Sequence, residues 1–240
     1  MKEKKLELKN ICKRFAENEV LRNVSLDVFA GEHVTVLGPS GCGKSTVMNI
    51  LTGILDADEG AVNVNGRVGY MQQKDLLLPW KTCLENVILP AIIGGTPRGE
   101  AEAAALPYFK TFQLEGCEKH YPGEMSGGMR QRASFLRTFL SSGDILLLDE
   151  PFGAVDSITR GNLQQWLIGV SRELELTILM ITHDIEEAVL LSDRIYVLSD
   201  KPSSVKDEII VDYCRDDKGQ RLFETEFLDM KKRILEDLQS

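Results

Sequence analysis

The chain has 240 residues, 43% hydrophobic and 27% charged, a balance typical of a globular protein with a substantial core. Its formal net charge of −9, from 37 acidic and 28 basic side chains, argues against non-specific nucleic-acid binding, because a polyanion would be repelled. Five scattered cysteines without a C-x-x-C pair favour a reducing, cytosolic compartment. No apolar run approaches the roughly 18 residues that span a bilayer, so we expect any membrane role to come through partners.

The amino-terminal part of the chain predicts strands followed by a helix. Residues 6–11 and 24–28 alternate apolar and polar side chains, as half-buried antiparallel strands do. Residues 33–37 form a short apolar run, typical of a buried strand, that ends in a glycine-rich loop. Helical spacing follows from Lys44 to Leu55, with an apolar face made of Val47, Ile50, Leu51 and Ile54.

The middle of the chain predicts a hairpin and then a helical insert. Residues 61–65 and 67–71 are rich in β-forming residues on either side of Asn65-Gly66, which is a strong signal for a β-hairpin. Between Leu76 and Pro122 the sequence is rich in Ala, Leu, Glu and Gly, and we expect this segment to be mostly helical.

The carboxy-terminal part returns to alternating strands and helices. Residues 145–148 and 177–181 are apolar strands, each followed by a helical stretch, so the pattern predicts an α/β core with a parallel sheet. The tail from Phe227 to Leu238 has helical spacing and a polar face of mixed charge, which favours a helix docked on the core over a membrane anchor. Its apolar positions are Phe227, Met230, Ile234 and Leu238.

A complete phosphate-binding loop lies between a predicted strand and a predicted helix. It reads Gly38-Pro39-Ser40-Gly41-Cys42-Gly43-Lys44-Ser45-Thr46 and satisfies G-x-x-x-x-G-K-[ST]. Glycines let successive backbone N–H groups face phosphate oxygens, and the helix start adds its positive end. We expect Lys44 to reach the β- and γ-phosphates of ATP and Ser45 to bind Mg²⁺. The alternative is a glycine-rich turn matching by chance, but the context agrees with the motif.

An acidic pair follows the apolar strand of residues 145–148. A P-loop enzyme needs a carboxylate for its metal at the end of a strand, and Asp149 provides it. Glu150 is then placed to orient and deprotonate the attacking water. Such a pair is usually a solvated strand end, but a P-loop in the same chain favours the catalytic interpretation.

A second candidate phosphate site is Ser126-Gly127-Gly128, just before a helical run. Bare N–H groups at a helix start bind anions, although the segment in isolation would be interpreted as an N-cap with flexible glycines. One chain therefore holds two such helix starts, well separated in sequence. Two copies pairing head to tail, each supplying half of a shared site, is a simple explanation.

These motifs resemble the ATPases of ABC transporters in order and spacing over nearly the whole chain. The narrower resemblance is to importers of nitrate, sulfonates, taurine or pyrimidine precursors of thiamine. It rests on Leu77-Leu78-Pro79-Trp80, on Ser126-Gly127-Gly128-Met129-Arg130-Gln131-Arg132 and on Pro151-Phe152-Gly153-Ala154-Val155-Asp156.

The resemblance implies an α/β fold with a P-loop NTPase core, a mixed sheet, an antiparallel β subdomain and a helical subdomain. A single ABC ATPase domain would cover residues 1–240. Its RecA-like core with the β subdomain would take residues 1–75 and 140–215, its helical subdomain residues 76–139 and its helical tail residues 216–240.

The resemblance also implies roles for single residues near the nucleotide. Phe15 matches the aromatic residue that stacks on adenine, although composition alone would place it in the core. Gln73 matches the glutamine that touches Mg²⁺ and the attacking water, and counting back from Leu77 favours it over Gln72. His183 would hydrogen-bond the γ-phosphate and hold Glu150 and water in line.

Other implied roles lie at the contact between two copies. Ser126, Gly127 and Gly128 would bind the γ-phosphate held by the opposite protomer, and Asp156 would shape the contact. His33 and His120 match no functional position and are interpreted as structural. The sequence departs from the family pattern at three places, none of which is expected to abolish activity. Met125 replaces the usual leucine and conserves its volume, and Met129, where many members have glutamine, is common in this importer group. Val155 replaces a frequent leucine and could tune the contact between protomers.

The implied protein is a transport ATPase on the cytoplasmic face of the membrane. It would bind ATP and Mg²⁺, form a homodimer, and work with two integral-membrane permease subunits and a separate solute-binding protein, without nucleic acid. The segment from Gln73 to Val87 would dock the permease. Two alternatives stay open: a soluble ABC ATPase of DNA repair or translation, which usually has a coiled-coil insertion or tandem cassettes, and a P-loop kinase, which would not need Ser126-Gly127-Gly128 and His183.

Overall fold

A computed structural model describes residues 2–142, 144–153, 155–211 and 225–239. The chain divides into two compact units, one made of Met1–Gly66 with Glu175–Ser240 and the other of Arg67–Leu174, and each unit is described by itself. Ala154, Cys214 and residues 216–224 of the expected tail lie outside the described residues.

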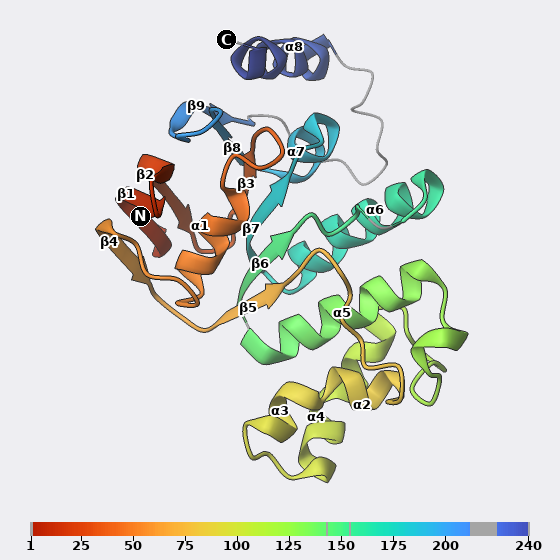
Figure 1. Cartoon of the computed structure of the whole chain (residues 1–240). Helices are drawn as coiled ribbons and strands as arrows, with labels where there is room; N and C mark the ends of the chain where they lie inside the picture. The colour runs from red at the N-terminus through yellow and green to blue at the C-terminus, as the bar shows by residue number, and fades with distance from the viewer. Residues whose placement is uncertain (1, 143, 154, 212–224, 240) are drawn as a thin grey trace. The chain divides into compact units, whose positions relative to one another are not determined.

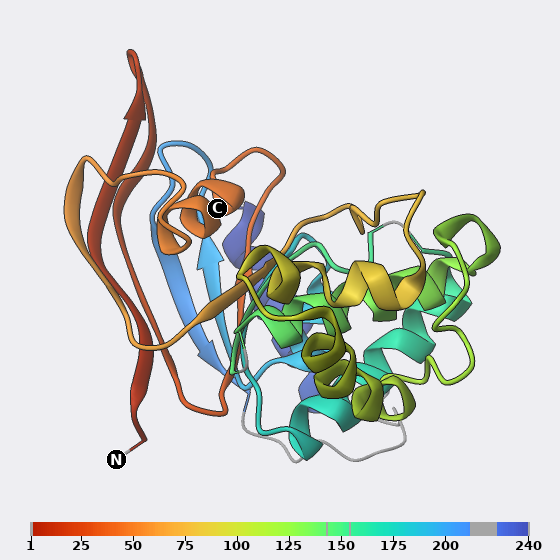
Figure 2. The same ribbon diagram turned by 90° about the horizontal axis from the view of Figure 1, so that it is seen from below.

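The first unit begins with a three-stranded antiparallel sheet. Its strands are β1 (Lys4–Phe15), β2 (Asn18–Phe29) and β4 (Glu59–Val64), in the order β2-β1-β4. Figure 2 shows β1 and β2 as the long red pair near the N-terminus. Because Leu6 and Leu8 are buried between less buried neighbours, the expected alternation and the antiparallel β subdomain are confirmed.

Four further strands of this unit form a mixed arrangement. They are β7 (Thr177–Thr182), β3 (His33–Leu37), β8 (Arg194–Leu198) and β9 (Val205–Ile210), in that order (Figure 1). The first three are parallel and β9 is antiparallel to β8. Every residue of β3 is buried, as expected for a parallel strand covered on both faces.

Three helices of the first unit accompany these strands: α1 (Lys44–Leu51), α7 (Ile185–Leu191) and α8 (Thr225–Gln239). Phe227 and Ile234 of α8 are buried in one core with residues of α7, β3, β8 and β9, while Met230 and Leu238 pack against it. The predicted docking of the tail helix on the core is therefore confirmed.

Helix α1 is shorter than the sequence pattern indicated. It ends at Leu51 rather than Leu55, because Gly53 adopts φ +70° and the N–H groups of Ile54 and Leu55 turn back to the carbonyl of Asn49. The predicted apolar face is correspondingly wrong at Ile54, which is 67% exposed.

The predicted hairpin around Asn65-Gly66 is also wrong. Strand β4 pairs with β1, with Leu6 opposite Val64, whereas β5 (Val68–Met71) pairs in parallel with β6 (Ile145–Asp149). The turn signal of Asn65-Gly66 is local. Pairing of β4 and β5 with strands that are far away in the sequence overrides it.

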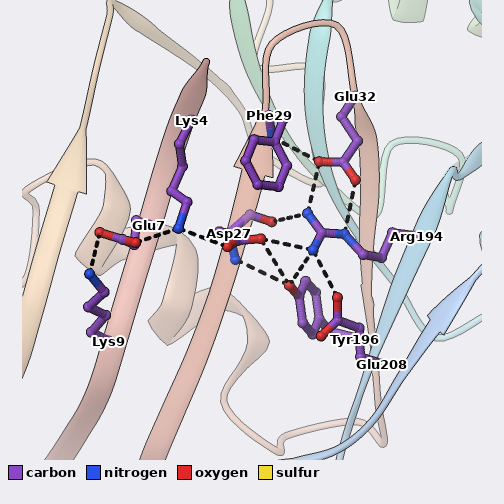
Figure 3. A network of polar contacts seen from close by, with 9 residues as sticks. All are labelled: Lys4, Glu7, Lys9, Asp27, Phe29, Glu32, Arg194, Tyr196 and Glu208. Atoms are coloured by element: carbon purple, nitrogen blue, oxygen red, sulfur yellow. Dashed lines mark hydrogen bonds and ion pairs between the residues drawn. The ribbon is translucent and has the colours of Figure 1, made fainter. Parts of the chain in front are cut away.

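A polar network joins the two groups of strands in the first unit (Figure 3). Arg194, at the start of β8, binds both carboxylate oxygens of Glu32 through Nε and Nη2, at 2.9 Å each. Its Nη1 also contacts Asp27 of β2 at 2.8 Å and Glu208 of β9 at 2.8 Å. One guanidinium thus ties the antiparallel sheet to the mixed strands.

The second unit combines the parallel pair β5–β6 with helices. Its helices are α2 (Cys83–Val87), α3 (Leu89–Ile93), α4 (Arg98–Thr111), α5 (Gly127–Ser142) and α6 (Ser157–Glu173), and a short 3-10 turn lies at Pro122–Glu124. Edge-to-face and tilted aromatic contacts join α4, α5 and α6, and they involve Tyr108, Phe112, Phe135, Phe139 and Trp166. The expected helical subdomain is present. Among the described helices, none is long and apolar enough to cross a membrane.

Candidate functional site

The phosphate-binding loop runs from the end of β3 to the start of α1, as the sequence predicted. Gly43 has φ +116°, and a Cβ there would lie 2.9 Å from side-chain atoms of both Val20 and Leu21. A Cβ at Gly38 would lie 3.0 Å from the Sγ of Cys42. Glycine is therefore favoured at both places. At Gly43 the left-handed backbone and the packing both favour it, and at Gly38 the packing does.

Lys44 is held inside the loop. Its side chain is only 6% exposed, and Nζ donates hydrogen bonds to the carbonyl oxygens of Gly38 at 2.7 Å and Pro39 at 2.8 Å. These two hydrogen bonds hold the ammonium group against the backbone of the loop. The same loop is anchored from outside, because the hydroxyl of Ser203 donates a hydrogen bond to the carbonyl of Cys42.

His183 lies beside the beginning of this loop in the strand register. Strands β3 and β7 are parallel with Leu37 opposite Thr182, so the next residues, Gly38 and His183, leave the sheet at the same edge. The turn is fixed from both sides. Thr182 Oγ1 donates to Glu187 at 2.7 Å, and Asp184 accepts hydrogen bonds from the first N–H groups of α7.

Phe15 ends strand β1 and is 46% exposed, so it is a surface residue and not a core residue. The ammonium of Lys13 lies 5.7 Å from the centroid of its ring. An exposed aromatic face next to a cation is suited to stacking on a planar base that carries phosphates.

In the second unit, Asp149 ends strand β6 and Tyr70 of β5 contacts it. The Tyr70 hydroxyl donates to the carboxylate of Asp149 at 3.2 Å. Burial, together with the negative charge of Asp149, raises the pKa of Tyr70 well above its usual value, so the phenol stays a donor. The sequence alone did not single out Tyr70, because its contact with Asp149 depends on the pairing of β5 with β6, which are far apart in the chain.

Glu150 and Gln73 come together although they are far apart in the sequence. Gln73 Nε2 donates a hydrogen bond to Oε2 of Glu150 at 3.1 Å. Glu150 has φ +46°, a strained backbone for a residue with a side chain, and its carbonyl accepts from the N–H of Gly153. A Cβ at Gly153 would lie 3.9 Å from both Gln73 Nε2 and Glu150 Oε2, so Gly153 lies beside the pair at ordinary contact distance.

The segment Ser126-Gly127-Gly128 forms the start of α5. Ser126 Oγ accepts a hydrogen bond from the N–H of Met129 at 3.2 Å, so it is the N-cap of this helix. Gly128 is buried, and a Cβ there would lie 3.0 Å from Thr159 of α6. Met125 is 4% exposed, consistent with a residue that conserves core volume.

The helices α5 and α6 are linked to the acidic strand end. Gln131 of α5 donates from Nε2 to the carbonyl of Pro151, next to Glu150. Asp156 is the N-cap of α6 and accepts from the N–H of Thr159 at 3.0 Å. Hydrogen bonds from the Thr159 side chain and then from its backbone N–H lower the pKa of Asp156 below its usual value. The sequence motif that contains Gln131 gave no reason to assign it a role.

The segment expected to dock a partner is held by Asn86. This side chain is 0% exposed, and its amide donates to the carbonyls of Leu78, Lys81 and Thr82 while its oxygen accepts from the N–H of Leu78. The fixed turn presents Trp80, which is 70% exposed. A buried asparagine therefore supports an exposed tryptophan, and sequence alone gave no reason to single out Asn86.

The predicted site residues thus fall into two sets. The first unit holds Phe15, Gly38 to Thr46 and His183, and the second holds Gln73, Ser126 to Gly128, Asp149, Glu150 and Asp156. Within the second unit the contact of Gln73 with Glu150 is direct. His33 is 7% exposed with Nδ1 3.3 Å from the carbonyl of Leu191, which agrees with a structural role.

Comparison with known proteins gives consistent similarities. Residues 21–153 match the family model described as ABC transporter. The chain is 46% identical to the formylaminopyrimidine import ATP-binding protein ThiZ of Halalkalibacterium halodurans, over 78% of this chain and 76% of the relative. It is 42% identical to the aliphatic sulfonates import ATP-binding protein SsuB of Bacillus licheniformis, over 82% and 79%.

Solved structures agree with these relatives. The dimeric structure of MJ0796, described as a bacterial ABC transporter cassette, superposes with a TM-score of 0.73 and 32% identity, covering 87% of this chain and 100% of that one. A structure of the same cassette is described as a post-hydrolysis state bound to ADP and Pi. The fold expected from the sequence is confirmed.

Proposed function

Because this chain belongs to the ABC transporter family of ATPases, we propose that it powers the import of a small solute through partner membrane subunits. The observation that carries the proposal is the complete phosphate-binding loop between β3 and α1, with the ammonium group of Lys44 buried against its carbonyls. Sequence similarity to two import ATP-binding proteins supports import as the direction of transport.

In this proposal the nucleotide is bound first by the first unit. The ring of Phe15 stacks on adenine, and the backbone N–H groups from Gly38 to Thr46 surround the phosphates. Lys44 exchanges its two carbonyl acceptors for β- and γ-phosphate oxygens, which are stronger partners because they are charged. His183, at the strand edge beside Gly38, hydrogen-bonds the γ-phosphate.

The second unit supplies the hydrolytic groups. Glu150 takes a proton from the attacking water, and Gln73, already hydrogen-bonded to Glu150, orients that water. Ser45, Asp149 and Gln73 offer a hydroxyl, a carboxylate and an amide oxygen, an all-oxygen donor set that fits Mg²⁺. The ion would neutralise charge that develops on the phosphates.

A second copy of the chain completes the site. Ser126, Gly127 and Gly128 begin α5 with backbone N–H groups that suit the γ-phosphate of the opposite protomer, and Asp156 lies at the contact. The dimeric solved structure of the similar cassette supports this arrangement. Closure of the dimer over ATP would move two permease subunits, which dock near Trp80, on the cytoplasmic face of the membrane.

The test of the chemistry is the variant Glu150→Gln. We expect ATP turnover to fall by about 10²–10⁴-fold, as for loss of a general base, while ATP binding remains. The matched control is Glu115→Gln, which makes the same charge change at an exposed position of the same unit. Turnover unchanged in Glu150→Gln would show that Glu150 is not the base.

The same variant tests the shared site. With ATP and Mg²⁺, Glu150→Gln protein should sediment as a dimer, and without nucleotide as a monomer. A monomer under both conditions, also in the presence of the permease, contradicts the shared site but leaves the ATPase assignment intact.

The solute belongs to the class of sulfonates, taurine, nitrate or pyrimidine precursors of thiamine. The names of the two relatives support sulfonates and formylaminopyrimidine in this class. A separate binding protein selects the solute, so the decisive measurement is which small molecules raise the melting temperature of that protein. No shift with any member of the class would overturn the assignment of the solute.

A further inference from the structure

An open pocket in the second unit lies outside the proposed nucleotide site. Its volume is about 650 Å³, and its lining comes from the end of α4, from α5 and from α6. Most of the lining residues are polar: Thr111, Gln113, Arg132, Asn162, Gln165 and Glu173. None of them belongs to the residues predicted to bind ATP or Mg²⁺.

Arg132 is a cation without a counter-ion in the described part of the chain. Its Nε is shielded from solvent, and no described residue accepts a hydrogen bond from it. The guanidinium carbon lies 5.7 Å from the centroid of the Trp166 ring, a cation–π contact. Burial lowers the pKa of Arg132 from its usual value. A partly buried charge of this kind costs free energy unless an anion compensates it.

The indole ring of Trp166 lies next to the guanidinium of Arg132 and is held in place by its surroundings. It is 8% exposed, and its Nε1 donates a hydrogen bond to the carbonyl of Thr111 at 3.3 Å. The ring therefore keeps its orientation, and it offers an apolar surface next to the guanidinium. One turn further along α6, Gly169 also lines the pocket, and a Cβ there would meet no atom within 4 Å.

From this arrangement we infer that the pocket binds a small organic acid, whose anionic group pairs with the guanidinium of Arg132. Guanidinium groups bind carboxylates, sulfonates and phosphates through paired N–H donors. The amides of Gln113, Asn162 and Gln165 supply hydrogen bonds to the polar atoms of the ligand, and the Trp166 ring contacts its carbon skeleton.

Size and charge narrow the class of ligand. A pocket of about 650 Å³ is larger than a single inorganic ion and is in the range of small-molecule sites. The carboxylate of Glu173 also lines it, which disfavours a polyanion such as a nucleoside triphosphate. A singly charged acid, or one that also carries an ammonium group, fits best.

The pocket is lined by α5 and α6, the two helices that begin at the proposed dimer contact. Helix α5 starts at Gly127 and α6 is capped by Asp156, while Arg132 and Trp166 lie one to three turns further along these helices. An acid bound between them would therefore stiffen the pair of helices that present Ser126-Gly127-Gly128 and Asp156.

The experiment uses the tryptophans of the full chain. There are two, Trp80 and Trp166, so the variant Trp80→Phe leaves Trp166 as the only indole reporter. Its fluorescence is titrated with propionate, propanesulfonate and propyl phosphate at constant ionic strength, with propionamide as the uncharged control. We expect a saturable change with at least one acid and none with propionamide. No saturable change with any acid, or an equal change with propionamide, overturns the inference.

Two further variants in the Trp80→Phe background locate the site. Arg132→Gln should weaken binding about 10–100-fold, the loss expected for a hydrogen bond to a charged group. Gly169→Leu should abolish binding by filling the pocket, while Gly161→Leu, at another exposed glycine of α6 with open space around it, should not. If circular dichroism shows that Arg132→Gln does not fold, the comparison of Gly169→Leu with Gly161→Leu tests the location of the site. Equal binding by both leucine variants places the acid elsewhere and overturns the inference.

Discussion

The side-chain amide of Gln73 donates a hydrogen bond to the carboxylate of Glu150, with 3.1 Å between Nε2 and Oε2. Gln73 follows strand β5 and Glu150 follows strand β6, and these strands are parallel neighbours with Met71 opposite Leu148. The contact therefore results from strand register, because both residues leave the sheet at the same edge. A proposed base and a proposed water-orienting group are held together before nucleotide binds.

The first prediction concerns this pair. Gln73→Ala should lower ATP turnover by about 10–100-fold, because Glu150 and the attacking water lose a positioning group, while ATP affinity changes little. The control is Gln72→Ala, which removes a neighbouring amide that is also exposed. Steady-state turnover and ATP binding are measured for both. A loss confined to Gln72→Ala would show that counting back from Leu77 selected the wrong glutamine.

The second prediction concerns Arg194, the centre of the network in Figure 3. Its side chain is 12% exposed and pairs with Asp27, Glu32 and Glu208. Arg194→Met leaves these acids without their shared cation, so we expect the free energy of unfolding to fall by about 2–4 kcal/mol.

The matched control for that prediction is Arg22→Met. Arg22 also pairs with a glutamate, Glu19, but it is 57% exposed, and exposed ion pairs contribute little to stability. Urea unfolding of the purified chain measures both changes. Equal losses in the two variants would mean that the Arg194 network contributes no more than a surface ion pair.

The third prediction is a dependence of stability on pH through Asp27. Burial opposes ionisation of this carboxyl, but the nearby Lys4 and Arg194 outweigh burial and hold the pKa of Asp27 below its usual value. A carboxyl with a lowered pKa in the folded state stabilises the fold above its unfolded pKa of about 3.9, and this contribution is lost as pH falls through the folded pKa.

Asp27→Asn therefore should be less stable than the unmodified chain at pH 7, and the difference should shrink below about pH 4. The measurement is urea unfolding at a series of pH values. Asp56→Asn, at an exposed aspartate of the same unit, serves as the comparison. A stability difference for Asp27→Asn that stays constant down to acid pH would contradict the proposed ionic origin.

Sequence was sufficient where function depends on contiguous residues. The loop from Gly38 to Thr46 and the acidic end of β6 are local patterns whose backbone context is also local, so both were placed on the predicted elements. The tail helix was predictable for the same reason, since Phe227 and Ile234 mark one buried face.

Sequence was insufficient where partners are remote. Asn65-Gly66 indicated a hairpin, but β4 and β5 each pair with a strand that no local signal identifies. Arg194 gave no signal at all, because Asp27 and Glu32 lie more than a hundred residues earlier in the chain. The family resemblance implied a role for Gln73, but its direct contact with Glu150 was not predicted, and the register of β5 and β6 explains that contact physically.

The last prediction separates packing from ligand contact within the phosphate-binding loop. Gly43 and Gly41 both have positive φ, +116° and +80°, so alanine costs backbone strain of about 1–2 kcal/mol at either position. A methyl group at Gly43 also meets Val20 and Leu21 at 2.9 Å, whereas one at Gly41 meets no atom within 4 Å. Gly43→Ala should therefore destabilise the nucleotide-free chain more than Gly41→Ala does.

The same loop also provides a test of ATP binding, in which Gly41 is the informative position. The open space beside Gly41 is where we expect the backbone to approach a phosphate, so Gly41→Ala should lower ATP affinity with only the strain penalty on stability. Urea unfolding without nucleotide and the ATP-induced rise in melting temperature measure the two effects separately. If Gly41→Ala keeps the full ATP-induced rise in melting temperature, the phosphates do not approach Gly41. The proposed phosphate contact of the loop from Gly38 to Thr46 would then not include this glycine.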